Sequence, residues 1–268
     1  MGGSGGGRRH GRRGLRDLWV GRGARARFRW PVVLEETSCR ARGLVRGCDT
    51  VRLRPLSVSD ESAWQGLRLA DDARLRPWEA TLPAGSGEVL SAFRPHVREQ
   101  GRQARQGDAM PFVVEVDGVL AGQLSVAPIQ WGSARSATLG YWIGSPWAGR
   151  GVTTLAVAMA LDHLLGEGVG LHRVEINIRP ENVPSLAVVG KLGLREEGLR
   201  RRLLHIDGAW ADHRSFAVTS EERGPGYVAR LEAGGGRVPG PSGQPPVGVP
   251  PAGHAARVPG SGPREPYG

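Results

Sequence analysis

Apolar residues recur at about every second position before a glycine-containing turn near residue 150, and at about every 3.6 residues after it. This change of period restricts the possible folds strongly. Before the turn, residues 111–126 form two strand-like runs around Asp117-Gly118, a hairpin signal because both turn positions favour positive φ. Residues 137–143 indicate a third strand, and residues 152–165 an apolar helix. The sequence therefore predicts antiparallel strands followed directly by a buried helix.

Further elements are expected on both sides of this segment. The order is strand, two helices, three strands, helix, strand, helix and two strands, which indicates an α+β domain around one sheet. The additional predicted strands are 51–55, 172–178, 199–206 and 210–218, and the additional predicted helices are 59–69, 86–106 and 185–192.

Charge and composition divide the chain into three parts. Residues 1–48 contain 12 Arg against 3 acidic residues and few spaced apolar positions, and residues 223–268 are rich in Pro and Gly. Neither segment is expected to bury enough surface to fold alone, so both are predicted to be disordered. Residues 49–222 contain 19 basic and 21 acidic residues, a net charge of −2, and are predicted to form the domain. A native start near Val45 is one interpretation of this division.

The net charge of +10 invites a nucleic-acid interpretation, but the excess of arginine lies in the tails. The chain contains one lysine, Lys191, so an Arg/Gly/Pro coding bias explains the basic N-terminal tail without a partner. We expect no nucleic-acid partner except through that tail.

The two cysteines, Cys39 and Cys48, both precede the predicted domain, so no disulfide framework is expected. A predicted domain without cysteines fits the reducing cytoplasm. No apolar run approaches the length of a membrane span, and no His, Cys, Asp or Glu cluster has the spacing of a metal site. We predict a cytoplasmic protein with no membrane partner and no metal.

The turn at residues 145–151 joins a strand to the helix and contains two glycines, Gly149 and Gly151. A backbone of this kind directs several N–H groups one way, and the positive end of the helix lies behind them, which suits a pyrophosphate. Arg150 either adds positive charge or faces solvent. The turn is not a Walker A loop, because no Gly-Lys-Ser/Thr follows. The alternative is a glycine turn that binds no ligand.

Two segments together resemble the GNAT superfamily of acetyltransferases: GYWIGSPWAGRGVTTLAVAMALDHLL and NIRPENVPSLAVVGKLGL. The segments VRLRPL, LRPWEATLP and DGAWADH, with Asp60, resemble its ribosomal-protein-alanine N-acetyltransferase branch. The resemblance covers residues 51–222. It implies a central, mostly antiparallel sheet of about seven strands flanked by helices. It also implies that acetyl-CoA donates an acetyl group to an amine, here the N-terminal α-amino group of a protein.

The resemblance also assigns cofactor residues. The pyrophosphate would lie on backbone amides of the loop, where Ala148 and Thr153 depart from the family pattern without removing a backbone donor. A backbone N–H of Trp142 or Ile143 would stabilise the developing oxyanion. Asn182 would contact the cofactor, although Asn182 and Ser185 equally suit a helix cap. The cofactor-binding residues are expected to be Trp142, Ile143, Gly149, Arg150, Gly151, Val152, Thr153, Thr154, Asn182 and Ser185.

Two residues are assigned to catalysis. Ser185 is expected to contact the departing thiolate and donate a proton, and Glu79 to accept a proton from the amine, directly or through water. Glu79 is equally interpretable as a solvated loop charge. Trp78 and Glu79 are predicted to contact the acceptor. Some branches of the superfamily have a tyrosine four residues after the serine, where this chain has Val189.

Four further titratable residues, His172, Glu175, His205 and His213, are more simply interpreted as structural. Three functions remain open on the sequence. They are acetylation of a protein N-terminus, acetylation of a small amine such as a polyamine, and non-catalytic binding of acyl-CoA.

Overall fold

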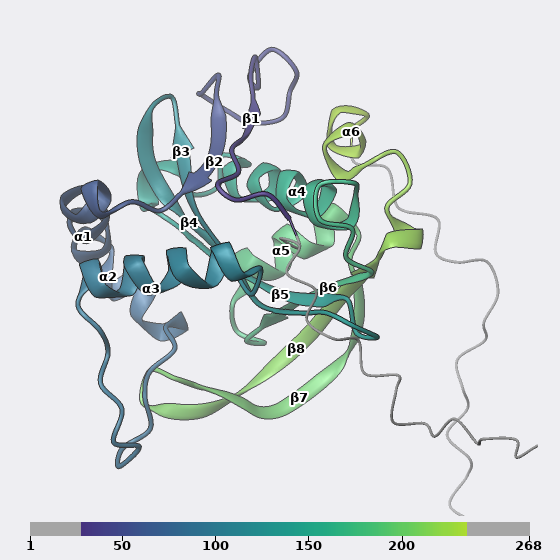
Figure 1. The fold of residues 1–268 in the computed structure, drawn as a ribbon. Coiled ribbons are helices and arrows are strands. Elements are labelled where there is room, and N and C mark those ends of the chain that lie inside the picture. The colour runs from purple at the N-terminus through teal and green to yellow at the C-terminus, as the bar shows by residue number, and fades with distance from the viewer. Residues whose placement is uncertain (1–27, 235–268) are drawn as a thin grey trace, which may run out of the picture. The chain divides into compact units, whose positions relative to one another are not determined.

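One eight-stranded sheet forms the centre of the molecule in the computed structural model, which describes residues 28–234 (Figure 1). The strand order is β1-β2-β3-β4-β5-β6-β8-β7, and every neighbouring pair is antiparallel except β5 and β6. The strands are β1 (Leu34–Glu36), β2 (Val51–Pro55), β3 (Met110–Val116), β4 (Val119–Gln130), β5 (Ser136–Ile143), β6 (Arg173–Ile178), β7 (Arg195–Ile206) and β8 (Ala209–Thr219).

Helices cover both faces of this sheet (Figure 1). Side chains alternate between the two faces along a strand, so Phe112 packs with α4, whereas Val113 packs with Val97 of α3. One face carries α1 (Glu61–Ala70), α2 (Asp72–Leu75) and α3 (Phe93–Gln106), and the other carries α4 (Val152–Leu165) and α5 (Val183–Leu192). Short helical turns are η2 (Val58–Asp60), η3 (Arg76–Trp78), η4 (Ser145–Trp147) and η5 (Ser220–Glu222).

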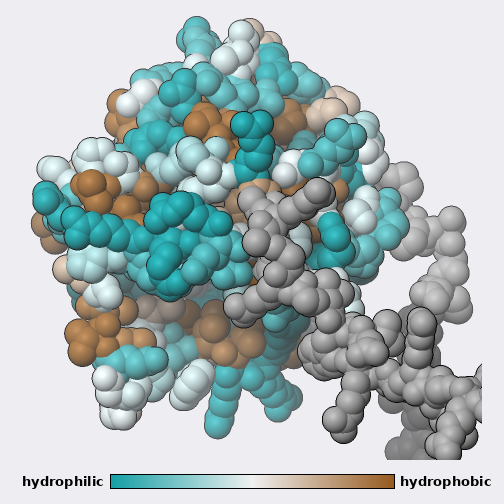
Figure 2. Space-filling view, in the orientation of Figure 1, coloured by the Kyte–Doolittle hydropathy of each residue, from teal (hydrophilic) through white to brown (hydrophobic). Residues whose placement is uncertain are grey.

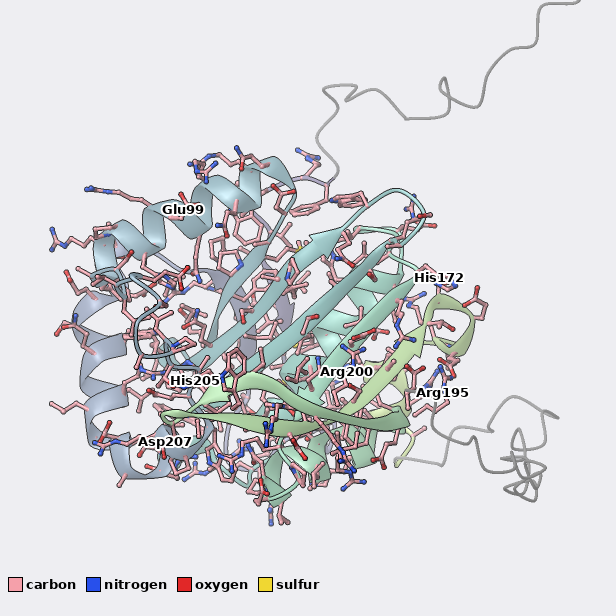
Figure 3. The ribbon with its side chains drawn as sticks, turned by 90° about the horizontal axis from the view of Figure 1, so that it is seen from below. Glu99, His172, Arg195, Arg200, His205 and Asp207 are labelled. Carbon is pink, nitrogen blue, oxygen red and sulfur yellow. The ribbon has the colours of Figure 1, made fainter. Side chains whose placement is uncertain are left out.

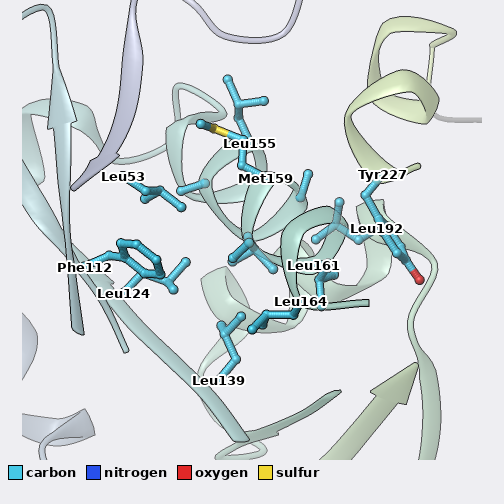
Figure 4. Packing of buried hydrophobic residues seen from close by; sticks show 14 of the residues in the cluster. Leu53, Phe112, Leu124, Leu139, Leu155, Met159, Leu161, Leu164, Leu192 and Tyr227 are labelled. Carbon is cyan, nitrogen blue, oxygen red and sulfur yellow. The ribbon is translucent and has the colours of Figure 1, made fainter. Parts of the chain in front are cut away.

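The α4 helix is the centre of the larger hydrophobic core. Leu155, Leu161 and Leu164 are buried on different sides of it, because the helix packs against the sheet, α5 and α6 (Tyr227–Glu232). Figure 4 shows these leucines among side chains of the sheet and of α6. Polar side chains cover most of the molecular face in Figure 2, where apolar groups appear in separate areas. Burial on this scale fixes the start of α4, and therefore the loop before it.

The predicted fold class is confirmed: the structure is α+β, with a mostly antiparallel sheet flanked by helices. All seven predicted strands are present, and β1 is an eighth. The helix predicted over 86–106 begins only at Phe93, because Gly87 takes positive φ and the N-cap residue Ala92 has a non-helical backbone. Within residues 28–234, no helix combines the length and the hydrophobicity that a membrane span needs.

The prediction that residues 1–48 are disordered is wrong for residues 28–48. Cys39 and Cys48 are buried in the larger core, and burial raises the pKa of both thiols. The strand β1 pairs with β2 as an added edge strand. The prediction was wrong because it considered only the low apolar content of the segment. The edge of the sheet and the surface of α4 provide a place where its few apolar side chains are buried. Residues 1–27 lie outside the part of the chain that the structure describes.

The predicted boundary at Glu222 is also wrong. The α6 helix follows it and packs against α4, with Tyr227 only 2% exposed. Asp162 of α4 accepts hydrogen bonds from the backbone N–H of Tyr227 (2.8 Å) and Val228 (3.0 Å), and so satisfies the start of α6. The rest of the predicted C-terminal tail, residues 235–268, lies outside the described residues.

Candidate active site

The parallel strands β5 and β6 separate partway along their length. They pair only from Ser136 to Thr138, whereas β5 continues to pair with β4 as far as Ile143. The backbone of residues 139–143 on the β6 side therefore has no strand partner and is open to a ligand, except that the Ile143 carbonyl accepts from Arg74. The amide of Gly144 donates to Ala121 of β4 (2.7 Å), and strand amides alternate in direction, so the Ile143 amide points to the open side and the Trp142 amide does not. Of the two predicted oxyanion donors, this geometry favours Ile143.

The loop predicted to bind pyrophosphate, residues 148–154, follows β5 and η4 and runs into the first turn of α4. We call it the anion loop. Gly149 (φ 71°) and Gly151 (φ 93°) adopt left-handed conformations that other residues rarely tolerate. Gly151 is the N-cap and offers no side chain, so the first-turn amides of Val152, Thr153 and Thr154 have no side-chain cap. Free amides and the positive end of α4 suit an anionic ligand.

A cleft of about 620 Å³ lies between the separated strands and the α1–α2 region. It receives side chains from α1, η3, β4, β5, α4 and α5. The predicted site residues that line it are Trp78, Glu79, Trp142, Ile143, Thr153, Asn182 and Ser185. Gly149, Arg150, Gly151, Val152 and Thr154 lie in the adjoining loop and first turn instead. One cleft therefore brings together the predicted catalytic residues and half of the predicted cofactor residues.

Ser185 and Asn182 take different roles in α5. The Asn182 side chain is the N-cap and accepts from the Ser185 backbone amide (3.2 Å), so the capping interpretation holds for Asn182. The Ser185 hydroxyl is not used for capping. It lies 2.7 Å from the Tyr141 hydroxyl of β5, and both residues line the cleft.

Tyr141 is a site residue that the sequence analysis missed. Burial raises the pKa of Tyr141 to about 12, although its hydrogen bond to Ser185 acts in the opposite direction. The phenol is therefore protonated at neutral pH and available as a donor to Ser185. Its signal in the sequence was the alternation of β5, which puts Tyr141 on the same face as Leu139 and towards α5.

Glu79 is not a free loop charge. It forms an ion pair with Arg68 of α1, whose guanidinium also lies over the rings of Trp64 (4.8 Å) and Trp142 (5.2 Å). This ion pair holds the Glu79 carboxylate beside Arg68 in the lining of the cleft. Arg68 was also missed by the sequence analysis, because α1 and the loop of Glu79 meet only in the folded structure.

The Trp78–Thr81 segment is joined to the tip of the β7–β8 hairpin. Thr81 donates its backbone N–H to the His205 carbonyl (2.9 Å), and the Asp207 amide donates to the Glu79 carbonyl (3.0 Å). The His205 ring lies 2.8 Å from the Thr81 hydroxyl. We call these contacts the hairpin tether. Figure 3 shows His205 and Asp207 at this tip and His172 near the opposite end of the sheet.

The remaining titratable residues considered in the sequence have structural partners. His213 is buried and lies 3.0 Å from the Ala211 carbonyl, and burial lowers its pKa. His172 lies 3.2 Å from Glu221, and Glu175 accepts from Arg173 and Arg200. Over residues 28–234, no three His, Cys, Asp or Glu side chains are grouped so that they could hold a metal ion.

The arrangement fits acetyl-CoA: loop amides for the pyrophosphate, a free strand edge for the pantetheine and a cleft containing Ser185. The N–H groups of the anion loop suit the pyrophosphate, and the open backbone groups of the strand edge suit the amides of the pantetheine.

Comparisons with known proteins agree with this geometry. The model of the Acetyltransferase (GNAT) domain family matches residues 50–195. The ribosomal protein uS5-alanine N-acetyltransferase of Escherichia coli (strain K12) is 31% identical over 188 residues, 66% of this chain and 92% of that protein. The probable N-acetyltransferase YjcK of Bacillus subtilis (strain 168) is 27% identical over 175 residues, 65% of this chain and 96% of that protein.

A solved structure described as Mycobacterium smegmatis RimJ in complex with CoA-disulfide is 39% identical. It superimposes with a TM-score of 0.68 over 76% of this chain and 95% of its own. The predicted family and cosubstrate are thus confirmed, and the chain belongs to the GNAT family as an acetyl-CoA-dependent N-acetyltransferase.

Proposed function

We propose that the acceptor of this N-acetyltransferase is the N-terminal α-amino group of a protein. The charge of the cleft carries the proposal. Arg68 and Arg74 line it, and Glu79 is the one carboxylate among the described lining residues. Glu79 is paired with Arg68, and Arg74 is paired with the buried Asp71, so the described lining offers no free carboxylate. A polyamine or another polycation would find no partner here for its several positive charges, whereas a peptide has to place only one. The name of the Escherichia coli relative supports the same acceptor class.

The acidity of an α-amine also fits this cleft. The α-amino group has a pKa of about 8 and a lysine side chain about 10.4, so at pH 7.5 about a quarter of the former but only about one in a thousand of the latter is neutral. Glu79 is the one carboxylate among the described lining residues, and an α-amine needs little help to lose its proton. The site therefore selects α-amines over lysine side chains by their acidity.

The remaining residues take roles that follow from their positions. Acetyl-CoA supplies the acetyl group as a thioester. The amides of Gly149 to Thr154 hold its pyrophosphate, and the Ile143 amide stabilises negative charge on the carbonyl oxygen. Trp78, stacked by Arg179 at 5.6 Å, forms the wall on the acceptor side. Asn182 keeps α5 in place through its cap and thereby positions Ser185.

Ser185 donates the proton that the sulfur needs on leaving. Because Tyr141 is protonated and lies 2.7 Å away, its hydroxyl replaces the serine proton as that proton departs. The acceptor nitrogen loses one proton to Glu79 or water, and the sulfur gains one from Ser185, which takes its replacement from Tyr141. The proton released by the nitrogen then returns through solvent to Tyr141, so the protons balance over one turnover.

Release of free CoA tests the proposal. The full chain is given acetyl-CoA with peptides beginning in alanine or serine, peptides with a blocked N-terminus and an internal lysine, or spermidine. We expect release with the free N-terminal peptides, and a loss of about 100-fold for Ser185→Ala. A matched control is Ser125→Ala, because Ser125 also lines the cleft but lies on β4. Release with spermidine alone would refute the proposed acceptor, and release with none would refute catalysis of α-amine acetylation.

A further inference from the structure

Two carbonyl groups of the anion loop accept hydrogen bonds from Arg46, which lies in residues 28–48, the N-terminal segment. The guanidinium of Arg46 donates to the Gly149 carbonyl (2.6 Å), and the backbone N–H of Arg46 donates to the Arg150 carbonyl (2.9 Å). Arg46 lies 103 residues before Gly149 in the chain, so the folded structure alone brings them together.

These two contacts fix the direction of loop amides. In a planar trans peptide, the C=O of one residue and the N–H of the next point in opposite directions. Holding the Gly149 carbonyl therefore directs the Arg150 amide to the other side of the loop. Holding the Arg150 carbonyl directs the Gly151 amide in the same way. Two amides proposed to bind the pyrophosphate thus owe their orientation to Arg46.

The segment that carries Arg46 is firmly attached. Leu44, Val45 and Cys48 are buried in the larger core. A methyl group added to Gly151 would lie 3.0 Å from the Leu44 carbonyl oxygen, so the segment packs directly on the loop. The matched family model starts at residue 50, and all of these contacts come from residues before it.

We propose that Arg46 is a positioning residue of the acetyl-CoA site, which orients the amides of Arg150 and Gly151 towards the pyrophosphate before the ligand binds. The proposal rests on the anion loop as the pyrophosphate site. Orientation in advance increases affinity, because the loop loses less freedom on binding. It also explains how the site tolerates Ala148, where the family pattern has Arg or Gln: the cation is supplied from the N-terminal segment and acts on the loop itself.

The test compares two ligands with and without a pyrophosphate. Dissociation constants of CoA and of S-acetylpantetheine are measured for the full chain by tryptophan fluorescence, since Trp142 lines the cleft. For Arg46→Ala we expect the Kd of CoA to rise about tenfold, which corresponds to about 1.4 kcal/mol. The Kd of S-acetylpantetheine should stay within about twofold. Arg40→Ala is the matched control, because Arg40 lies in the same segment but pairs with Asp49 (3.4 Å).

Three results would overturn the proposal. The Kd of CoA would be unchanged in Arg46→Ala, or it would rise equally for both ligands, as a general loss of structure predicts. The third is a CoA effect that vanishes at about 0.5 M salt, because a distant charge is screened under these conditions whereas hydrogen bonds that orient a loop are not. Binding is measured without an acceptor, so a wrong acceptor would leave the expected result intact, whereas failure of the unaltered protein to bind CoA would refute the anion loop itself.

Discussion

The contact between Tyr141 and Ser185 predicts a specific kinetic defect for Tyr141→Phe. The change removes one hydroxyl and keeps the ring, so the packing of β5 against α5 is retained. A neutral hydrogen bond contributes about 0.5–1.5 kcal/mol, which corresponds to about a 2- to 12-fold change in rate. We expect kcat to fall within this range, because the serine loses the group that replaces its proton. The Kd of CoA should stay within about twofold, since the anion loop is untouched.

The assay is peptide-dependent CoA release across pH, with single-turnover measurements to isolate the acetyl-transfer step. Because burial raises the pKa of Tyr141 to about 12, the phenol does not titrate at ordinary working pH, and the shape of the pH profile should be the same in both proteins. In a protein that already carries Ser185→Ala, Tyr141→Phe should cause no further loss of rate, because the two groups act as a unit. An unchanged single-turnover rate in Tyr141→Phe, or additive losses in the double variant, would refute the relay.

Three further outcomes are expected. Gly151→Ala should lower the free energy of unfolding by about 1–2 kcal/mol and weaken CoA binding, because φ is 93° and the backbone of the N-terminal segment is close; Gly190→Ala, in an open helical position, should not destabilise in the same urea titration. Burial lowers the pKa of His213 below 6.5, so the unfolded chain binds a proton that the folded chain does not, and the free energy of unfolding should fall as the pH drops through and below about 6.5. His213→Gln should reduce this fall between about pH 7.5 and about pH 5.5, and an unchanged slope would contradict the assignment. Tyr227→Ala should cost about 3–5 kcal/mol, because residues 223–234 pack on the folded domain, and a loss below about 1 kcal/mol would contradict this.

The sequence predicted the elements best where the hydrophobic pattern is strong. Residues 137–143 and 152–165 were assigned to the correct strand and helix, with boundaries that differ from the structure by at most a residue. The loop between them was also found, because two glycines at a strand-to-helix junction have few other uses. The weakly apolar segment 28–48 was assigned wrongly, since its stability comes from surfaces supplied by distant parts of the chain.

Contacts between elements could not be predicted in the same way. Ser185 was found from its position relative to Asn182, a local pattern, whereas Tyr141 touches it from a strand 44 residues earlier. The pairing of Glu79 with Arg68 likewise depends on how α1 lies against the following loop. The hydrophobic periodicity of a single helix or strand does not indicate which residues of two different elements will touch. The search for a general base from sequence therefore identified Glu79 but not the arginine that pairs with it.

The hairpin tether limits the movement of one wall of the cleft. Because Thr81 and His205 connect the α2–α3 loop to the hairpin tip, the loop residues Glu79 and Ala80 that line the cleft are held in place. A flexible chain end can enter beside a fixed wall, whereas the surface of a folded protein would meet the wall first. We therefore expect acceptors to need several unfolded residues at their N-terminus. Such a requirement would favour nascent or flexible chain ends, whatever residue stands first.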